Sequence, residues 1–513
     1  MLAGRRGATC RVHCDVAALR GRFPEGRRLR HETLRGKLTE LFALAEAHRF
    51  VTLRLVFLTE AHLLGSIDFR ILVYVGSALL LLAGGLLISA VDRDARPLFT
   101  GIAAAFLLSP DNYEASLWTT GALEHFGLVG YAFASLYCLS RPGVGWQIGA
   151  GVLALAAAGT SASGLMLVPA GGLLLGLMRR WRGALVWTLC GAALFAVYFI
   201  GYEAPPYQGS LGTYLRDPLV PARFLFMAVG GFGIYPSVAL GFGVALSTYW
   251  VWMTASGRIR SLPPIVVAWV AFLLLSFAAI AWGRASFGDR GALVSRYRVY
   301  SELLVLLSLA ALFWQLPRAY GMRLLWAVLP LSLLWALAGW RHELPQLEGF
   351  FIINQSHLDY YAAEGSSVPD DLMSAAFRDL RLEAARQLGT YDPKRAARAP
   401  RDLVAETRVL DATRPASVWV VTPSVGRRAM VVNAYGPGHE GDGMVWLENG
   451  ERSYRGKLEA APPAPLALGH RTGILWGVYS LAGVTRGRYR VGVGSDDATR
   501  PAVVWSDYWI NVE

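Results

Sequence analysis

The sequence predicts an α-helical polytopic membrane domain followed by an extracytoplasmic helical segment and a β-sandwich domain. Three observations lead to this fold class. Apolar segments separated by short Arg-rich loops run from residue 69 to residue 340. The composition is 54% hydrophobic and only 17% charged, which is more apolar than an ordinary globular chain. Residues 341–513 are polar and end in a series of short β-rich runs.

These patterns divide the chain into four regions. Residues 1–44 form a basic N-terminal segment, 45–340 the membrane domain, 341–415 a helical extracytoplasmic connector and 416–513 the β-sandwich-like domain. Apolar residues at helical spacing predict a helix over 370–388 in the connector. Alternation and turn residues predict the strands. The β-rich runs are 418–421, 430–434, 444–447, 474–479, 489–493 and 503–512.

The membrane domain is predicted to cross the bilayer about ten times. Two short segments meet at a bend over residues 161–164, and the region 224–254 contains glycines near Gly230 together with Pro236. Such an interruption favours a re-entrant piece before the full span. The predicted segments are 69–91, 98–109, 113–139, 146–160, 165–178, 184–202, 224–254, 265–282, 299–314 and 324–340.

The basic residues decide which side each loop occupies. The net charge is +12, and many of the arginines lie in short loops beside apolar segments. This is the positive-inside pattern of membrane proteins, so we expect membrane lipids and no nucleic acid among the partners. Loops near residues 93, 141, 180, 259 and 320 are then cytoplasmic. Loops near 111, 162, 210 and 290, and the whole chain after residue 340, are extracytoplasmic.

An even number of spans also places residues 1–68 outside, which conflicts with the basic composition of residues 1–37. These residues contain no apolar run that could export them. Either a span upstream of Met1 is missing, or residues 51–64 cross the membrane despite Arg54, Glu60 and His62. Burying those groups would cost several kcal/mol. We therefore expect a missing span, and an amphipathic helix over 51–64 at the outer interface.

Polar residues that could perform chemistry gather in the predicted outer loops. In the first such loop Asp111 precedes a helix on which Glu114, Trp118 and His125 fall on one face, with Glu124 turned about a quarter circle away. Ionisable residues in a span usually face a cavity or a partner. The alternative is that Glu114 lies among lipid headgroups and that His125 bonds to a neighbouring helix.

Two further clusters lie on the same predicted side. One contains Arg284, Arg296 and Tyr297, and its guanidinium groups suit a phosphate, although contact with lipid headgroups is an alternative. The other contains Glu46, His48 and Arg49, which solvation at a helix end would also explain.

In three stretches the chain resembles bacterial integral membrane glycosyltransferases of the GT-C type, which use a polyprenyl-phosphate-linked sugar. Residues 45–49 (AEAHR) are similar to an Asn-Glu-His-Arg pattern in an outer loop of such proteins, with Ala47 where the pattern has Glu. Residues 109–118 (SPDNYEASLW) resemble a Ser-Pro, Tyr/Trp-Glu, Trp pattern. Residues 283–301 (GRASFGDRGALVSRYRVYS) resemble a Gly-Arg and Ser-Arg-Tyr pattern. The acidic residue that such enzymes carry soon after an initial span has no counterpart here.

The resemblance implies a GT-C-like membrane domain and three kinds of site residue. These are carboxylates that act on the acceptor, groups that hold the donor phosphate, and groups that bind the sugar or the acceptor. The expected carboxylates are Glu114, Glu46 and Asp111. The expected phosphate-binding groups are Arg296, Arg284 and Tyr297. The expected sugar- or acceptor-binding groups are Trp118, His48, Arg49 and His125.

The function expected from this resemblance is transfer of a sugar from a polyprenyl-phosphate donor to an extracytoplasmic glycan or lipid in the bacterial inner membrane. Asp92 and Asp94 fall on the inner side, so no metal ligand is assigned, and a divalent cation (Mg²⁺ or Mn²⁺) stays open as a cofactor. The alternatives are a transporter or flippase of a lipid-linked glycan and a non-catalytic, degenerate protein of envelope assembly.

Overall fold

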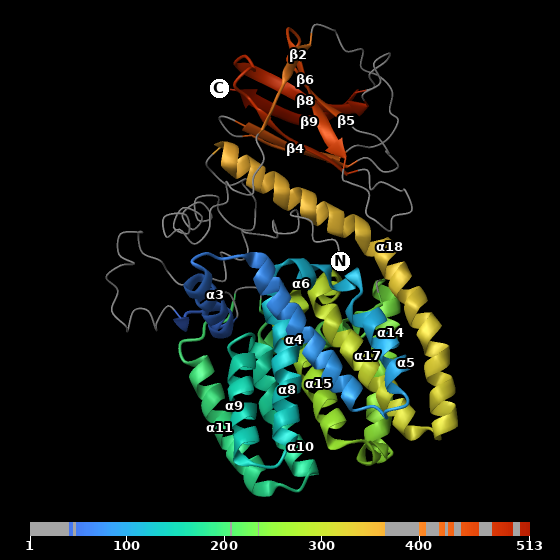
Figure 1. Cartoon of the computed structure of the whole chain (residues 1–513). Helices are drawn as coiled ribbons and strands as arrows, with labels where there is room; N and C mark the ends of the chain where they lie inside the picture. The colour runs from blue at the N-terminus through green and yellow to red at the C-terminus, as the bar shows by residue number, and fades with distance from the viewer. Residues whose placement is uncertain are drawn as a thin grey trace. The chain divides into compact units, whose positions relative to one another are not determined.

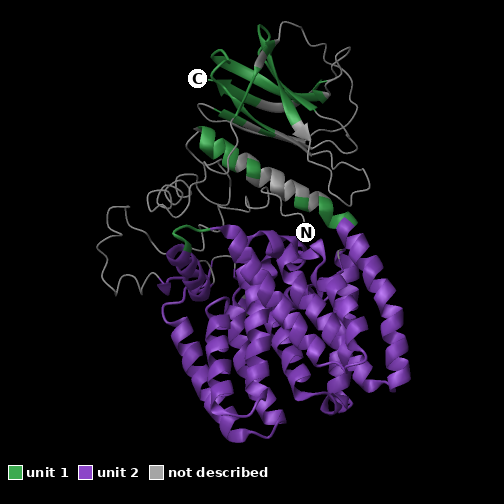
Figure 2. Cartoon of the chain, viewed as in Figure 1, with its two compact units in different colours: residues 1–16, 64–67, 341–513 green, residues 17–63, 68–340 purple. Residues whose placement is uncertain are grey.

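The computed structural model describes residues 41–44, 48–205, 208–233, 235–364, 400–406, 420–425, 429–435, 443–460, 474–495 and 503–512. Two compact units divide the chain. Residues 17–63 and 68–340 form one unit, and residues 1–16, 64–67 and 341–513 form the other (Figure 2). The first unit is helical, and the second holds the described strands (Figure 1).

The helices follow the apolar segments of the sequence closely. Short 3₁₀ or π turns connect several of them. The helices are α3 (Val51–Leu64), α4 (Phe69–Ser89), α5 (Arg96–Leu107), α6 (Tyr113–Leu117), α7 (Thr119–Gly121), α8 (Gly127–Ser140), α9 (Val144–Ala158), α10 (Leu167–Leu177), α11 (Trp181–Phe199), α12 (Leu211–Arg216), α13 (Leu219–Val229), α14 (Pro236–Ala255), α15 (Pro264–Arg284), α16 (Gly288–Ala292), α17 (Ser295–Gln315) and α18 (Arg318–Glu364).

Seven helical stretches among the described residues are long and apolar enough to cross a membrane, so the chain has the make-up of a polytopic membrane protein. The prediction of about ten crossings stays a prediction, because four further apolar helices are shorter. The seven are Phe69–Ser89, Thr119–Ser140, Trp181–Phe199, Pro236–Ala255, Pro264–Ala292, Ser295–Gln315 and Arg318–Leu344; the shorter four are Arg96–Leu107, Val144–Ala158, Ala162–Leu177 and Leu219–Val229.

The outer surface of the helical unit carries large apolar side chains. Leu81 is 59% exposed, Leu185 is 62% exposed and Leu189 is 61% exposed. Soluble proteins rarely expose apolar side chains in such density, whereas a lipid-facing surface requires them. The exposed apolar side chains therefore support the same conclusion as the apolar composition of the helices, that the chain is a polytopic membrane protein.

Each of the ten predicted segments contains at least one helix, and residues 51–64 form α3. The third segment, however, is not the single unbroken helix that was predicted. Its backbone is extended at Trp118, which separates α6 from α7, and a π-helical turn follows over Ala122–Phe126. This interruption changes which side chains share a face, with consequences for the site.

The predicted interruption in 224–254 is present as a short helix, α13, followed by a glycine turn and α14. Gly230 and Gly243 allow these two helices to pack backbone against backbone. A Cβ atom built on Gly243 would lie 1.7 Å from the carbonyl oxygen of Phe226, and one on Gly230 would lie 2.0 Å from that of Ala239. The glycines are thus required by close packing of the two helices.

Loops that the positive-inside rule assigns to the cytoplasm contact one another. Arg180 donates hydrogen bonds to the carbonyl groups of Leu139 and Arg141, and Arg318 forms an ion pair with Asp94. In the same way Gln315 donates a hydrogen bond of 2.5 Å to the hydroxyl of Ser261. These loops therefore lie together in pairs at one end of the bundle, while the membrane side of that end stays a prediction.

The second unit contains a largely antiparallel sheet. Its strands run in the order β3-β4-β7-β6-β5-β8-β9, with β1 beside β7 and β2 beside β6. They are β1 (Arg401–Asp402), β2 (Val404–Glu406), β3 (Val420–Val425), β4 (Ala429–Tyr435), β5 (Gly443–Glu448), β6 (Ser453–Ala460), β7 (Ile474–Ser480), β8 (Gly487–Ser495) and β9 (Val503–Val512).

One hydrophobic core takes side chains from both halves of this sheet, including Met430 and Tyr479 on one side of β6 and Val445 and Val493 on the other. The β-rich tail is therefore confirmed. The sequence patterns did not indicate β6, nor the short strands β1 and β2, which lie in the region 341–415 that was predicted to be a helical connector. The helix predicted over 370–388 lies outside the described residues.

Candidate functional site

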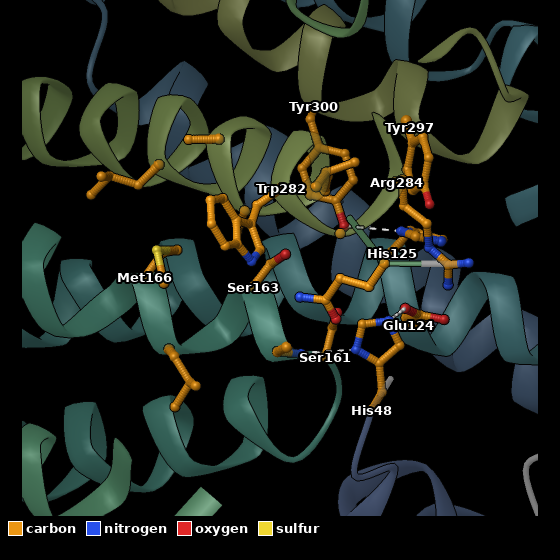
Figure 3. A pocket seen from close by; sticks show the side chains of 18 of the residues that line it. His48, Glu124, His125, Ser161, Ser163, Met166, Trp282, Arg284, Tyr297 and Tyr300 are labelled. Carbon is orange, nitrogen blue, oxygen red and sulfur yellow. Dashed lines mark hydrogen bonds and ion pairs between the residues drawn. The ribbon is translucent and has the colours of Figure 1, made fainter. Parts of the chain in front are cut away.

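A cavity of about 370 Å³ lies within the helical unit, where the predicted outer loops meet. Segments that are distant in the sequence contribute to it: the segment before α3, the π turn, the 3₁₀ turn at Ala162–Met166, the end of α11 with the loop after it, the end of α15 and the start of α17. Figure 3 shows how their side chains converge. Polar and aromatic lining residues are His48, Glu124, His125, Ser161, Ser163, Phe195, Phe199, Tyr202, Gln208, Trp282, Arg284, Tyr297 and Tyr300.

His48 faces Glu124 inside this cavity. Nε2 of His48 lies 3.7 Å from Oε1 of Glu124, and Nδ1 of His48 accepts a hydrogen bond of 3.3 Å from the backbone N–H of Ala162 (Figure 3). Because Nδ1 is the acceptor, a neutral ring carries its proton on Nε2 and presents it toward the carboxylate. The pair therefore offers one proton donor and one carboxylate to a bound molecule.

The charge state of His48 follows from its surroundings. Burial of the ring, and then the positive charges of Arg284 and Arg296, lower the pKa of His48 to about 3. The imidazole is consequently neutral at any pH near neutrality. It can orient a carboxylate or a substrate hydroxyl, but it does not add positive charge to the cavity.

His48 should make stability depend on pH. Its pKa is about 6.5 when unfolded and about 3 when folded, so the unfolded chain binds more protons between these values. Stability is then fully present above pH 6.5 and falls by up to roughly 1.4 kcal/mol per pH unit as the pH drops toward 3. We expect the unfolding midpoint in detergent to drop less between pH 6.5 and 4.5 in His48→Gln than in the wild type. Equal drops would contradict this assignment.

His125 lies deeper in the site and belongs to an aromatic group. Its Nδ1 is 3.0 Å from the hydroxyl of Tyr300, and its ring packs edge-on against Tyr297 and Tyr300, with centroids 5.5 and 5.9 Å away. Among the described residues, the buried Nε2 of His125 has no hydrogen-bond partner. That nitrogen can accept or donate a hydrogen bond to a ligand in the cavity.

The two predicted phosphate-binding arginines are placed differently. Arg284 lines the cavity at the end of α15, beside Trp282. Arg296 instead lies 3.3 Å from Oε2 of Glu114 and packs near the rings of Trp118 and Tyr297, with its guanidinium carbon 5.6 and 5.4 Å from the ring centres. Glu114, Trp118 and Arg296 are absent from the lining, so within the described residues Arg284 is the arginine that a cavity ligand meets.

Asp111 belongs to a separate buried group. It is 1% exposed, and the guanidinium of Arg298 lies 3.9 Å from its carboxylate and 3.4 Å from its carbonyl oxygen. Nearby, Asn112 donates a hydrogen bond of 2.7 Å to Glu302. Asp111 therefore helps to join the first outer loop to α17, and the structure places it outside the cavity.

Arg49 also differs from its predicted role. Its guanidinium donates hydrogen bonds to the backbone carbonyl groups of Phe42, Tyr198 and Ile200, which fixes the segment before α3 against the end of α11. Arg49 is a positioning residue for its neighbour His48 rather than part of the cavity lining. Glu46 lies outside the described residues.

Glu124 is the acidic lining residue that the sequence prediction left out of the site. On an ideal helix from residue 113, Glu114 and Trp118 would share the face of His125, with Glu124 about a quarter circle away. The extended residue Trp118 breaks that helix, so that Glu124 and His125 of the π turn line the cavity and Glu114 and Trp118 do not. Gly76 contributes to this geometry, because a Cβ there would lie 2.7 Å from the backbone of Ala122. π turns are frequent at functional sites, and an ionisable residue inside an apolar segment was the available signal.

Within the described part of the chain, no group of three or more His, Cys, Asp or Glu side chains is placed to hold a metal ion. No known protein family, curated protein or solved structure matches this chain.

Proposed function

We propose that the protein is a membrane glycosyltransferase that moves a sugar from a polyprenyl-phosphate donor onto an extracytoplasmic glycan or lipid acceptor in the bacterial inner membrane. The observation that supports this proposal is the convergence of Glu124, His48 and Arg284 on one cavity at the end of the bundle where the predicted outer loops meet. A carboxylate, a neutral imidazole and a guanidinium in an apolar surround suit transfer from a phosphate leaving group.

Each group has a role in the proposed step. The Glu124 carboxylate takes the proton from the acceptor hydroxyl, whose oxygen forms the new bond to the anomeric carbon. The bond between that carbon and the phosphate oxygen breaks, and the electron pair leaves with the polyprenyl phosphate. Arg284 stabilises the charge on that phosphate, and Arg296 adds a positive field from outside the cavity.

Two aromatic residues of the lining suit a sugar ring. Trp282 and Tyr297 line the cavity, and the Tyr214 hydroxyl holds the backbone of Trp282 by donating a hydrogen bond of 2.9 Å to its carbonyl oxygen. The predicted sugar-binding residue Trp118 packs beside Arg296 instead. We therefore propose Trp282 as the stacking residue.

The experiment is a transfer assay with the full-length protein in lipid nanodiscs. The donors are synthetic polyprenyl-phosphate monosaccharides with a labelled sugar, and mass spectrometry follows the polyprenyl phosphate that is released. Release of polyprenyl phosphate with transfer of the label supports the enzyme. Movement of intact donor across the bilayer of a proteoliposome without release would instead identify a transporter or flippase. Binding without either event would identify a non-catalytic protein.

Arg284→Ala is expected to raise the KM for the donor by about tenfold to hundredfold, because a hydrogen bond to a charged group contributes about 1.5–3 kcal/mol. Arg284→Lys should recover part of this loss, since the charge returns without the bidentate geometry. The matched control is Arg290→Ala on the same loop, which is exposed and absent from the lining. Equal KM values in Arg284→Ala and Arg290→Ala would contradict the proposal that Arg284 binds the donor phosphate.

A further inference from the structure

A second cavity lies between α9, α10 and α11 and shares no lining residue with the first. Its volume is about 560 Å³, which is within the range of ligand-binding pockets. Its walls are mainly apolar and include Leu155, Val168, Val186 and Leu194, of which Leu155 and Val186 are largely exposed. We call this cavity the α9–α11 groove.

Glycines keep the groove open. Gly151 of α9 lines it, and a Cβ atom built there would meet nothing within 4 Å. On the opposite wall Gly183 of α11 also lacks a side chain that would fill the space. Because α11 is long and apolar enough to span a membrane and α9 and α10 are shorter apolar helices, a hydrocarbon chain is the occupant that suits this groove.

One charged residue stands among the lining residues, and it is Arg182 at the start of α11. Its side chain is exposed, and no hydrogen bond or ion pair joins its guanidinium to another described residue. The neighbouring Arg180 behaves differently, because its guanidinium is bound to the carbonyl groups of Leu139, Ser140 and Arg141. Arg182 is thus available for an anion at one end of an apolar groove.

We propose that the α9–α11 groove binds an acidic phospholipid of the surrounding bilayer. One acyl chain lies along the apolar wall formed by the three helices, and the phosphate lies against Arg182. The Arg-rich loop over residues 179–182 is predicted to be cytoplasmic, and basic pockets between helices on that side bind anionic headgroups. The site is therefore a lipid site of the inner leaflet, and its phosphate end at Arg182 lies at the opposite end of the bundle from the predicted outer loops.

The test measures lipid retention by native mass spectrometry. Full-length protein in detergent is mixed with palmitoyl-oleoyl phosphatidylglycerol or with phosphatidylcholine of identical chains. We expect the wild type to retain phosphatidylglycerol about tenfold more tightly, the factor typical of one charged hydrogen bond. Arg182→Ala should remove this preference, and Arg260→Ala, an exposed arginine outside the groove, should keep it.

A second pair of variants tests the apolar wall. Gly151→Leu fills the groove and should lower retention of both lipids. Gly149→Leu is the matched control, because this glycine of the same helix also has open space around it but does not line the groove. Equal retention of the two lipids by the wild type, or wild-type retention in Gly151→Leu, would overturn the proposal. So would stoichiometric displacement of phosphatidylglycerol by polyprenyl phosphate, which would assign the groove to a prenyl lipid instead.

Discussion

Replacing Glu124 by glutamine is expected to lower the turnover of sugar transfer by about 10²- to 10⁴-fold, which is the range that general acid–base catalysis contributes. The Glu124 side chain lines the cavity and faces His48, whereas an amide cannot take the acceptor proton. Shape and burial change little, so the variant should fold and insert normally. The measurement is the initial rate of polyprenyl-phosphate release in nanodiscs at saturating donor.

Glu114→Gln is the matched control for this variant. Glu114 pairs with Arg296 and is absent from the cavity lining, so its replacement should reduce the rate far less than Glu124→Gln. The reverse order of effects would show that the acid of the first outer loop is Glu114, as the sequence pattern suggested. Full activity in both variants would show that neither carboxylate takes the acceptor proton, and it would contradict the proposal that the cavity is the catalytic site.

The helical segments were predictable because their apolar composition extends over whole elements. A chain of this kind needs many exposed apolar residues such as Leu185, so the pattern persists over each whole segment. Most strands of the tail were predictable for a similar reason; the short strands β1 and β2 and the longer β6 were not. The sequence of β6, SYRGKLEA, lacks an apolar run, and its position comes from pairing with β5 and β7.

The site was predictable by region but not by side chain. The loops that carry His48, His125 and Arg284 do meet, which the positive-inside rule indicated. An ideal helical wheel grouped Glu114 and Trp118 with His125, and it failed because one extended residue at Trp118 and one π turn are small local events with no distinct composition. The role of Arg49 was also missed, because its partners are the backbone carbonyl groups of Tyr198 and Ile200 at the end of α11, and a sequence pattern does not reveal backbone partners.

Arg298→Ala is expected to cause the largest loss of stability, about 3–5 kcal/mol, because it removes one partner of a buried ion pair. The Arg298 side chain is 8% exposed and that of Asp111 is 1% exposed, with 3.9 Å between the guanidinium and the carboxylate. Glu302, one helical turn further along α17, is buried as well. Without the guanidinium, two carboxyl groups remain in an interior that contains less positive charge.

The packing around Asp111 leaves little room for a rearrangement that would compensate for the lost guanidinium. A Cβ built on Gly339 of α18 would lie 2.6 Å from Oδ1 of Asp111, so there is no room for a side chain between α18 and the carboxylate. The measurement is the unfolding midpoint and the fraction of monodisperse protein after purification in detergent. Arg223→Ala is the control, because its ion pair with Asp289 is exposed and should contribute little.

A double variant separates charge from packing in this prediction. Asp111→Asn combined with Arg298→Met removes both charges and keeps most of the buried volume, so it should recover much of the stability lost in Arg298→Ala. Recovery would identify the uncompensated carboxylate as the cause of the loss. If the double variant is as unstable as Arg298→Ala, the guanidinium acts through its hydrogen bond to the Asp111 carbonyl instead, and the first outer loop depends on backbone anchoring to α17.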